Sequence, residues 1–398
     1  MAVRIIRGDA LTGLASLPDE SVHLCVTSPP YFGLRSYLPD DHPDKGKEIG
    51  LEATPEEFIA NLVAVFREVR RVLRPDAVLF VNIGDSYCNA DKWGGGGANT
   101  GKHTKSPDGS IPSWAGVRRK WKGLPGLKNK DLIGIPWMLA FALRADGWYL
   151  RGDYIWHKKN SMPESVRDRC TKAHEYVFHL SKSASYFWDQ EAIKEPATSG
   201  DGRAPHGRGQ ATIGGRPASG SRGENGGAAI ESRNKRSVWS INTQSFSESH
   251  FATMAPELAE TCIKAGSSQK GCCSKCGAPW ERDVERETVN LSNAAKAGTE
   301  IVGKGHATSQ VRRDHDIRNG PTSVTKTTGW SPSCSCEDAS VISCTVLDPF
   351  SGAGTTALVA DRLQRNAIGI DLHPDYPDMA ERRVNRDRGG LLDLMEEA

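Results

Sequence analysis

The chain has 398 residues, a formal net charge of +2 and a mean hydropathy of −0.49. A charge this close to zero excludes a globally basic nucleic-acid binder, so any nucleic-acid surface must come from local clusters of Lys and Arg. No apolar run approaches the ~20 residues of a membrane-spanning helix, and the start lacks the apolar core and cleavage site of a signal peptide. We therefore expect a cytoplasmic protein without membrane contact, whose ten cysteines serve as thiols or metal ligands.

The first elements expected are a short strand at residues 4–6 and a brief helix that ends near Leu17, separated by Gly8 and Asp9. Asp9 follows a strand directly. Its carboxylate is therefore placed either to accept hydrogen bonds from a bound cofactor or to cap the helix, and the residues alone favour neither interpretation.

The next strand, at residues 22–26, ends in the pentapeptide Thr27-Ser28-Pro29-Pro30-Tyr31. Open α/β sheets bind ligands at the carboxyl ends of their strands. Two consecutive prolines fix the backbone and remove two N–H donors, so the carbonyl groups of Ser28 and Pro29 point outward in a stiff arrangement. A hydroxyl precedes these carbonyl groups, and the aromatic ring of Tyr31 follows them. Such a site can accept hydrogen bonds from an amino group while Tyr31 stacks on the flat ring that carries it. The alternative is a proline-rich turn.

A polar segment at residues 32–50 is expected to form a mobile loop beside the substrate. Thr54 then predicts the start of a helix, because Pro55 and Glu57 stand at positions that favour a first turn. Apolar residues recur at helical spacing from Phe58 onward, and the helix is expected to end near Arg74.

A buried strand is expected at residues 77–83, and Asp85 just beyond it either contacts a bound ligand or holds a turn. Asp131 is expected to cap the next helix. Strands at residues 149–156 and 176–181 follow.

A nucleoside-binding unit is predicted near the C-terminus. It consists of a strand at 345–347, a glycine loop, a helix at 355–363 and a strand at 367–370 that Asp371 closes. Glycines let the backbone approach a ligand, and the acidic residue takes ribose hydroxyls. A phosphate-binding loop is disfavoured because no Gly-Lys-Ser/Thr is present. The final helix is expected at residues 376–388.

The pentapeptide at 27–31 resembles the catalytic motif of the amino-group DNA methyltransferases, and Asp348-Pro349-Phe350-Ser351-Gly352-Ala353-Gly354-Thr355-Thr356 resembles their S-adenosylmethionine loop. The order of the two motifs is that of the family's beta class, and the resemblance covers residues 3–184 and 232–384. It implies an α/β, Rossmann-like, S-adenosylmethionine-dependent methyltransferase fold with flexible insertions. The fold would be circularly permuted, with the catalytic half first and the cofactor loop last.

The resemblance also implies roles for individual residues. The catalytic residues would be Ser28, Pro29, Pro30 and Tyr31. The cofactor site would comprise Asp9, Thr27, Asp348, Phe350, Ser351, Gly352, Gly354, Thr355 and Asp371. His174 lies in a segment similar to one that lines the target-base pocket of the family, although such a histidine is more often structural. The partner would be double-stranded DNA with the target base flipped out, and a companion restriction endonuclease is a further expected partner.

Two cysteine pairs are candidate ligands of a metal. Cys273 and Cys276, followed by Cys334 and Cys336, supply four thiolates, the set that binds structural zinc in a tetrahedron. The 57 residues between the pairs are many more than a zinc ribbon uses. Free thiols are therefore the alternative.

The expected organisation is a catalytic half at 1–194 with a flexible insertion at 89–130, a target-recognition or linker region at 195–247, a returning helix at 248–267, a cysteine-rich zinc insertion at 268–344 and a cofactor half at 345–398. The arginine-rich residues 195–231 either contact DNA or form a linker. DNA contact is favoured for Arg233, Lys235 and Arg236, because arginine binds phosphates and reads guanine. Residues 283–328 are expected to form a loop.

Ser28 stands where adenine-specific members of the resembling family usually have Asp or Asn, and the serine form goes mostly with the N4 amine of cytosine. A neutral hydroxyl can donate to the ring nitrogen of cytosine while the carbonyl of Pro29 takes an amine hydrogen. We therefore expect a cytosine-N4 methyltransferase, with adenine-N6 as the alternative. An RNA methyltransferase and an inactive zinc-bearing DNA-binding protein are less well supported, the latter because the motif residues are intact.

Overall fold

The structure is a computed structural model that describes residues 1–88, 124–197, 232–244, 253–290 and 321–396. The chain divides into two compact units. The larger comprises Met1–Asp189, Arg236–Glu281 and Pro332–Ala398, and the smaller comprises Gln190–Lys235 and Arg282–Ser331. The insertions predicted at 89–130 and 195–231 lie largely outside the described residues.

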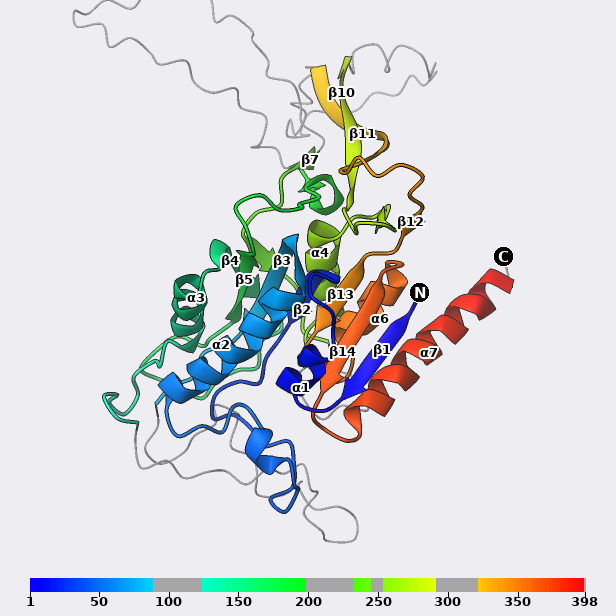
Figure 1. Cartoon of the computed structure of the whole chain (residues 1–398). Helices are drawn as coiled ribbons and strands as arrows, with labels where there is room; N and C mark the ends of the chain where they lie inside the picture. Colours follow the sequence, from blue (N-terminus) through cyan, green and yellow to red (C-terminus); the bar gives the residue numbers. More distant parts are fainter. Residues whose placement is uncertain (89–123, 198–231, 245–252, 291–320, 397–398) are drawn as a thin grey trace, which may run out of the picture. The chain divides into compact units, whose positions relative to one another are not determined.

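An eight-stranded sheet is the framework of the larger unit (Figure 1). In spatial order its strands are β1 (Val3–Arg7), β14 (Asn366–Asp371), β13 (Thr345–Asp348), β2 (Val22–Thr27), β3 (Leu73–Ile83), β5 (His174–Ser181), β4 (Tyr149–His157) and β8 (Val238–Ser240). Neighbouring strands are parallel except where they pair with β5. The α/β class and most of the expected strands are thereby confirmed.

Strand β13, which comes late in the chain, lies between β14 and β2. Val346 pairs with Leu24, and Leu347 pairs with Cys25. Because these strands are parallel, the residue that follows β2 and the loop that follows β13 emerge at the same edge of the sheet. The catalytic segment and the cofactor segment are therefore neighbours in space. That this order is a circular permutation stays a prediction.

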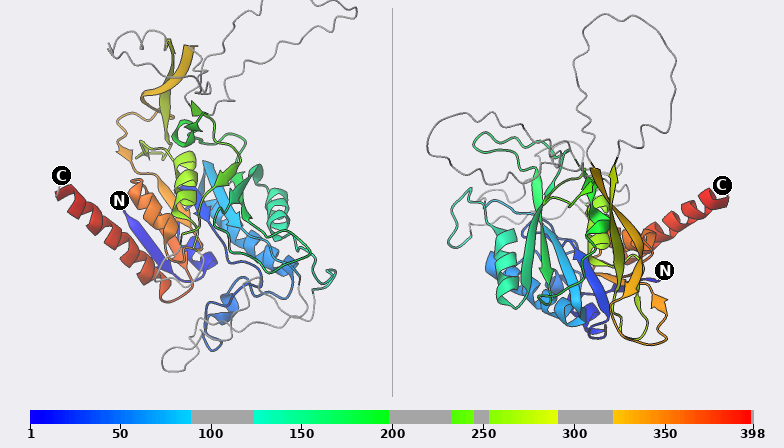
Figure 2. Two further views of the ribbon diagram at one scale, coloured as in Figure 1. Left: turned by 180° about the vertical axis from the view of Figure 1, so that it is seen from behind. Right: turned by 90° about the horizontal axis from the view of Figure 1, so that it is seen from above.

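Helices of the larger unit form two groups. Helices α1 (Ala10–Ala15), α2 (Pro55–Val72) and α3 (Ile135–Ala145) contact one another in one group, and α4 (Pro256–Gly266), α6 (Thr355–Arg362) and α7 (Tyr376–Glu396) in the other. The view from above in Figure 2 shows α2 and α3 on one side of the sheet and α4 and α7 on the other. Both faces of the sheet are covered, which explains why β2 and β3 read as continuous apolar runs.

Helix α2 begins as predicted. The Thr54 hydroxyl accepts a hydrogen bond from the Glu57 backbone N–H at 3.2 Å, and Pro55 occupies the first turn. Phe58 and Phe66 on its inner face are fully buried. The apolar spacing thus predicted both the helix and the face that packs on the sheet.

The predicted cap of α3 is wrong. The Asp131 carboxylate accepts from the backbone N–H of Lys128 at 2.8 Å, and the N-cap position of α3 is Gly134, with φ +86°. The donors at this helix start are satisfied from elsewhere: Asp85 Oδ1 accepts from Gly134 N at 3.0 Å and from Ile135 N at 3.1 Å. Asp85 therefore has the structural role and does not line the ligand cavity described below.

The predicted end of the final helix is also wrong, because α7 continues past residue 388 to Glu396. Two glycines lower helix propensity by roughly 1 kcal/mol each but do not forbid the helix. No helix in the described ranges combines the length and the apolar character needed to cross a bilayer.

Several short elements complete the described chain. They are the 3₁₀ turns η1 (Lys45–Lys47) and η2 (Glu191–Ile193), and three two-stranded sheets: β6 (Glu195–Pro196) with β7 (Ser232–Arg233), β9 (Cys272–Cys273) with β12 (Val341–Ile342), and β10 (Trp280–Asn290) with β11 (Pro321–Pro332). The loop predicted at 283–328 is therefore strand at both of its described ends, and its middle lies outside the described residues.

Candidate active site

A cavity of about 1320 Å³ lies in the larger unit, beyond the carboxyl ends of β2, β13 and β14. Both groups of predicted residues contribute to its wall: Ser28, Pro29, Pro30 and Tyr31 from one, and Asp9, Asp348, Phe350, Ser351, Gly352, Thr355 and Asp371 from the other. Single small-molecule sites measure roughly 300–1,000 Å³. The cavity therefore has room for a nucleoside cofactor and for a second planar group.

Tyr31 is held by a network at the cavity wall. Its hydroxyl donates to Glu175 Oε2 at 2.7 Å, and the same oxygen accepts from Asn82 Nδ2 at 3.1 Å. Lys158 forms an ion pair with the other carboxylate oxygen. Burial, with the Glu175 charge second, raises the pKa of Tyr31 well above its usual value, and the Ser28 side chain is a hydrogen-bonding neighbour that acts against this shift. The phenol therefore stays protonated and keeps donating to Glu175.

The position of the Tyr31 ring is also fixed by close packing. A Cβ at Gly84, just after β3, would lie 2.7 Å from Tyr31 Cε2, so only glycine leaves room for the ring. Glu175 from β5 and Lys158, which follows β4, approach from the neighbouring strands. The sequence interpretation missed Asn82, Lys158 and Glu175. Lys158 and Glu175 are far from the catalytic motif in sequence, and only the pairing of β5 with β3 and β4 brings them to Tyr31.

Asp348 joins the two halves of the site. Its carboxylate accepts from Thr27 Oγ1 at 2.6 Å, from Thr356 Oγ1 at 2.8 Å and from Phe350 N at 3.1 Å. Burial raises the pKa of Asp348 to about 6. Thr27 is fully buried and is absent from the cavity lining, so its visible role is to tie β2 to the loop after β13.

Asp371 shapes the opposite wall. One carboxylate oxygen accepts from Gly352 N at 2.6 Å, and the other accepts from His373 N at 2.9 Å. Burial raises the pKa of Asp371 to about 6. Nearby, the buried Ser351 Oγ has no hydrogen-bond partner among the described residues. The Asp371 carboxylate lines the cavity and keeps spare acceptor capacity, which suits the hydroxyl-rich ribose of a nucleoside.

The rest of the predicted loop is mainly structural. Gly354 has φ +73°, and a Cβ there would lie 2.5 Å from Ala380 Cβ, so glycine lets α6 approach α7. Thr355 Oγ1 accepts from Arg383 at 3.0 Å. Gly354 does not line the cavity, whereas Thr355 does.

At the start of the chain, Asp9 fits both interpretations. It lines the cavity, and it caps α1 by accepting from Thr12 N at 3.0 Å and from Thr12 Oγ1 at 2.7 Å. Lys47 lies 3.8 Å from the same carboxylate. The polar loop predicted beside the substrate also lines the cavity, through Arg35 and Tyr37 among others.

The residues predicted to contact DNA are not gathered at the cavity. His174 packs edge-on against Tyr176, with ring centroids 5.5 Å apart, and burial lowers its pKa. Arg233 belongs to the smaller unit and forms an ion pair with Glu195 at 2.9 Å. Lys235 also belongs to the smaller unit, and Arg236 belongs to the larger. Their contact with DNA stays a prediction.

The two cysteine pairs do come together. The sulfur atoms of Cys273, Cys276, Cys334 and Cys336 all lie within 4.8 Å of one another. The structure thus assembles the predicted set of four thiols from segments that are far apart in sequence.

Comparison with known proteins agrees with this geometry. Residues 22–273 and 337–382 match a family of N6/N4 methyltransferases described as DNA methylase. The chain is 34% identical over 388 residues to the type II methyltransferase M.XycI of Xanthomonas campestris pv. cyanopsidis, covering 98% of this chain and 89% of the relative. It is 34% identical over 380 residues to the type II methyltransferase M.Cfr9I of Citrobacter freundii, covering 96% and 87%.

A solved structure of a DNA modification methylase from Thermus thermophilus, complexed with S-adenosyl-L-methionine, matches with a TM-score of 0.45 and 19% identity, covering 96% of this chain and 93% of that one. The sequence matches cover most of the chain, and the cavity wall contains residues of both motifs. The chain belongs to the N6/N4 family of DNA methyltransferases, enzymes that use S-adenosylmethionine to methylate amino groups in DNA.

Proposed function

We propose that this enzyme methylates the N4 amine of cytosine in double-stranded DNA. The observation that carries the proposal is one cavity whose wall contains Ser28, Pro29 and Tyr31 on one side and Asp371 on the other. Ser28 stands where adenine-specific members of the resembling family usually have Asp or Asn, and this favours cytosine. A neutral hydroxyl can donate to the ring nitrogen beside the amine, which both bases carry and to which an ionised Asp could not donate.

The exocyclic amine is a poor nucleophile because its lone pair is delocalised into the ring. S-adenosylmethionine supplies an electrophilic methyl group when bound. The task of the protein is therefore to orient the amine and to draw its lone pair out of conjugation. The carbonyl of Pro29 accepts an amine hydrogen, Ser28 contacts the adjacent ring edge, and the ring of Tyr31 stacks on the base. A paired base is out of reach, so the target must leave the helix, at a cost of a few kcal/mol.

For the cofactor, we propose that Asp371 accepts the ribose hydroxyls and that Ser351 and the backbone at Gly352 contact the remainder. The support is the spare acceptor capacity of a carboxylate with two amide donors, together with the place of Asp371, Ser351 and Gly352 in the cavity wall. Asp348 and Thr27 support this wall from behind.

Mass spectrometry of nucleosides from DNA treated with the enzyme and S-adenosylmethionine tests the choice of base. We expect N4-methylcytosine. N6-methyladenine without N4-methylcytosine would establish the adenine alternative instead. Ser28→Ala should lower the rate on either base by roughly 10–1,000-fold, the range for losing a positioned hydrogen bond. Ser21→Ala, outside the cavity, is the matched control and should leave the rate unchanged.

We further propose a target site in duplex DNA and a companion restriction endonuclease that cleaves the same site, because the relatives are type II methyltransferases. Arg233, Lys235, Arg236 and His174 remain the proposed DNA contacts. Sequencing of methylated DNA would give the target site. Protection of that DNA from cleavage by an endonuclease encoded beside this enzyme would test the pairing.

A further inference from the structure

The cysteine knuckle, residues 272–278, is joined to the segment that carries the second cysteine pair. In the pairing of β9 with β12, Cys273 lies opposite Val341. Next to these strands, Ser274 N donates to Ser340 O at 2.9 Å, and Lys275 Nζ donates to the Glu337 carbonyl at 2.5 Å. These contacts, one between backbone groups and one from a lysine side chain, hold the two cysteine pairs close together.

The sulfur positions match a tetrahedral metal site. A zinc–sulfur bond of about 2.3 Å places the four sulfurs about 3.8 Å apart, and here all four lie within 4.8 Å of one another. The spacing of the four sulfurs is therefore close enough for one metal ion to bind all of them. Lys275 N also donates to Cys273 Sγ at 3.4 Å, a contact that favours a thiolate. Gly277, with φ +71°, provides the tight turn after Cys276.

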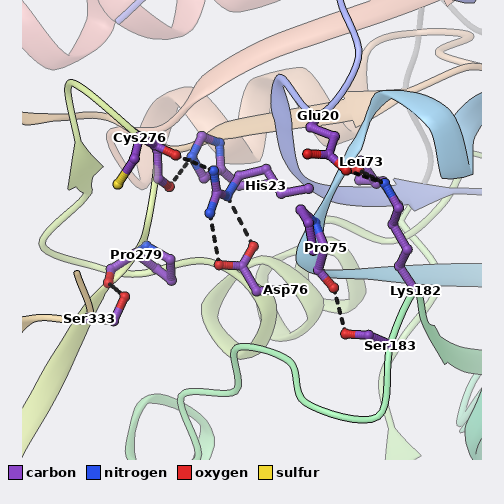
Figure 3. Close-up of polar contacts among 12 residues, drawn as sticks. Glu20, His23, Leu73, Pro75, Asp76, Lys182, Ser183, Cys276, Pro279 and Ser333 are labelled. Atoms are coloured by element: carbon purple, nitrogen blue, oxygen red, sulfur yellow. Dashed lines mark hydrogen bonds and ion pairs between the residues drawn. The ribbon is translucent and has the colours of Figure 1, made fainter. Parts of the chain in front are cut away.

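The knuckle contacts the central sheet through His23 of β2 (Figure 3). Thr345 N donates to His23 Nδ1 at 3.1 Å, so Nε2 carries the proton and donates to the Gly277 carbonyl at 3.0 Å. One ring thus bonds β2, β13 and the knuckle together. Since both ring nitrogens are occupied, the nearby set of His23, Cys272 and Cys344 lacks a free nitrogen to ligate a second metal.

Arg74 of β3 makes a second connection. Its guanidinium donates to the Cys276 carbonyl and is itself fixed by Asp76, at 3.0 and 3.1 Å. A Cβ at Gly277 would lie 2.7 Å from the Arg74 guanidinium, so the knuckle fits closely against this side chain. Both contacts are made near the amino ends of β2 and β3, opposite the ends that face the active site.

We propose that Cys273, Cys276, Cys334 and Cys336 bind one structural zinc ion, and that the zinc-bound knuckle fixes the amino end of β2 through His23. The catalytic motif begins at the other end of the same strand, about 17 Å away at 3.3 Å per residue. The metal thus stabilises the strand that positions Ser28 without contacting substrate. This proposal is independent of which base the enzyme methylates.

Elemental analysis of the full-length protein, purified without added metal, tests the metal site. We expect one zinc per chain, and Co²⁺ replacement should give the absorption of a tetrahedral four-thiolate site. Cys276→Ser and Cys336→Ser should each lose the zinc, whereas Cys170→Ser, an exposed cysteine outside the cluster, should keep it. Iron in place of zinc, a metal-free folded protein, or zinc retained by both cluster variants would overturn the assignment.

The role of His23 is tested by combining its removal with removal of the metal. Chelation should lower the melting temperature of the wild type, and of His157→Ala, a control on the distant strand β4, by the same amount. His23→Ala should still bind zinc and should melt at a lower temperature than the wild type. Chelation should lower its melting temperature by a smaller amount, because the connection to β2 is already broken. If chelation lowered the melting temperature of His23→Ala and of the wild type equally, the knuckle would not act through this histidine.

Discussion

Among single residues, Glu175 holds the catalytic motif through the hydroxyl of Tyr31. It accepts the Tyr31 hydroxyl at 2.7 Å and an Asn82 amide hydrogen at 3.1 Å. A carboxylate that holds two donors fixes the plane of the tyrosine ring, and that ring is the proposed stacking surface for the flipped base. Glu175 is therefore a positioning residue that acts through Tyr31.

Glu175→Gln should lower kcat by roughly 10–100-fold, the loss expected when a charged hydrogen-bond acceptor becomes neutral. The affinity for S-adenosylmethionine should change little, because Glu175 lies on the catalytic side of the cavity. Tyr31→Phe keeps the ring and removes only the hydroxyl, so it should resemble Glu175→Gln. Single-turnover methylation and calorimetric titration of the cofactor separate these effects. A fall in cofactor affinity equal to the fall in kcat would contradict the positioning role.

The pKa of Asp371 predicts a pH dependence of cofactor binding. In the proposed site, ribose hydroxyls would donate to the ionised Asp371 carboxylate. Burial raises the pKa of this carboxylate to about 6. Affinity should therefore be full above pH 7 and should fall by up to about tenfold per pH unit below pH 6. The stability of the ligand-free fold responds in the opposite sense: a carboxyl pKa raised above 3.8 adds stability as the pH falls through about 6.

Calorimetric titration with S-adenosylmethionine between pH 5 and 8 measures this dependence. Asp371→Asn should bind S-adenosylmethionine weakly, and its affinity should change little between pH 5 and 8. Asp348, whose pKa burial also raises to about 6, is retained in that variant. If cofactor affinity in Asp371→Asn still depended on pH as in the wild type, the titrating group would be Asp348.

Site residues could be predicted where a motif marked them, as at Ser28 and Asp371. Thr27 and Gly354 stand in the same motifs but do not line the cavity: the Thr27 hydroxyl bonds Asp348, and Gly354 begins α6 close to Ala380. Glu175 could not be singled out, since its role depends on β5 pairing antiparallel with β3. That pairing has no local signal in the sequence.

Among the elements, α3 shows a helix whose start is stabilised from another segment. Asp85 accepts from Ser86 N, Gly134 N and Ile135 N, at 2.9, 3.0 and 3.1 Å. Asp85→Ala should lower the free energy of unfolding by about 1–2 kcal/mol, the usual cost of a lost N-cap. Asp131→Ala removes a carboxylate near solvent whose partner among the described residues is Lys128, and it should cost clearly less. Urea unfolding of both variants checks that Asp85→Ala loses more free energy of unfolding than Asp131→Ala. Equal losses would contradict the capping role of Asp85.

Elements with local signals were predicted closely. Helix α2 has a capping threonine, a proline in its first turn and a regular apolar stripe, and its start agrees with the sequence. The start of α3 was misassigned because Asp85 is about 50 residues from the donors it satisfies. The strands β10 and β11 were missed because most of their residues are polar and pair only with each other.

At the scale of the whole molecule, the central sheet joins segments from both ends of the chain. Strand β13 pairs with β2 through Val346 and Leu24, and β14 pairs with β1. The buried core includes side chains from elements near both ends of the chain, among them Leu14 of α1, Cys25 of β2, Leu347 of β13 and Ile370 of β14. Neither half has a complete sheet of its own in this unit. The sequence predicted this interleaving only through the family resemblance, because strand order leaves no trace in local periodicity.

This interleaving has a consequence for the timing of synthesis. Thr27 and Thr345 are 318 positions apart (345 − 27), and ribosomes add about 5–20 residues per second. For about 16–64 s, strand β2 therefore waits on the ribosome with one edge unpaired, which is the state most prone to aggregation or chaperone binding. Nascent chains arrested before β13 emerges should be cut by protease within residues 22–31, and chains arrested after the last helix should resist. Equal resistance would mean that the first half folds alone. The order of segments in this chain thus sets a minimum delay between translation of the catalytic motif and the first possible methylation.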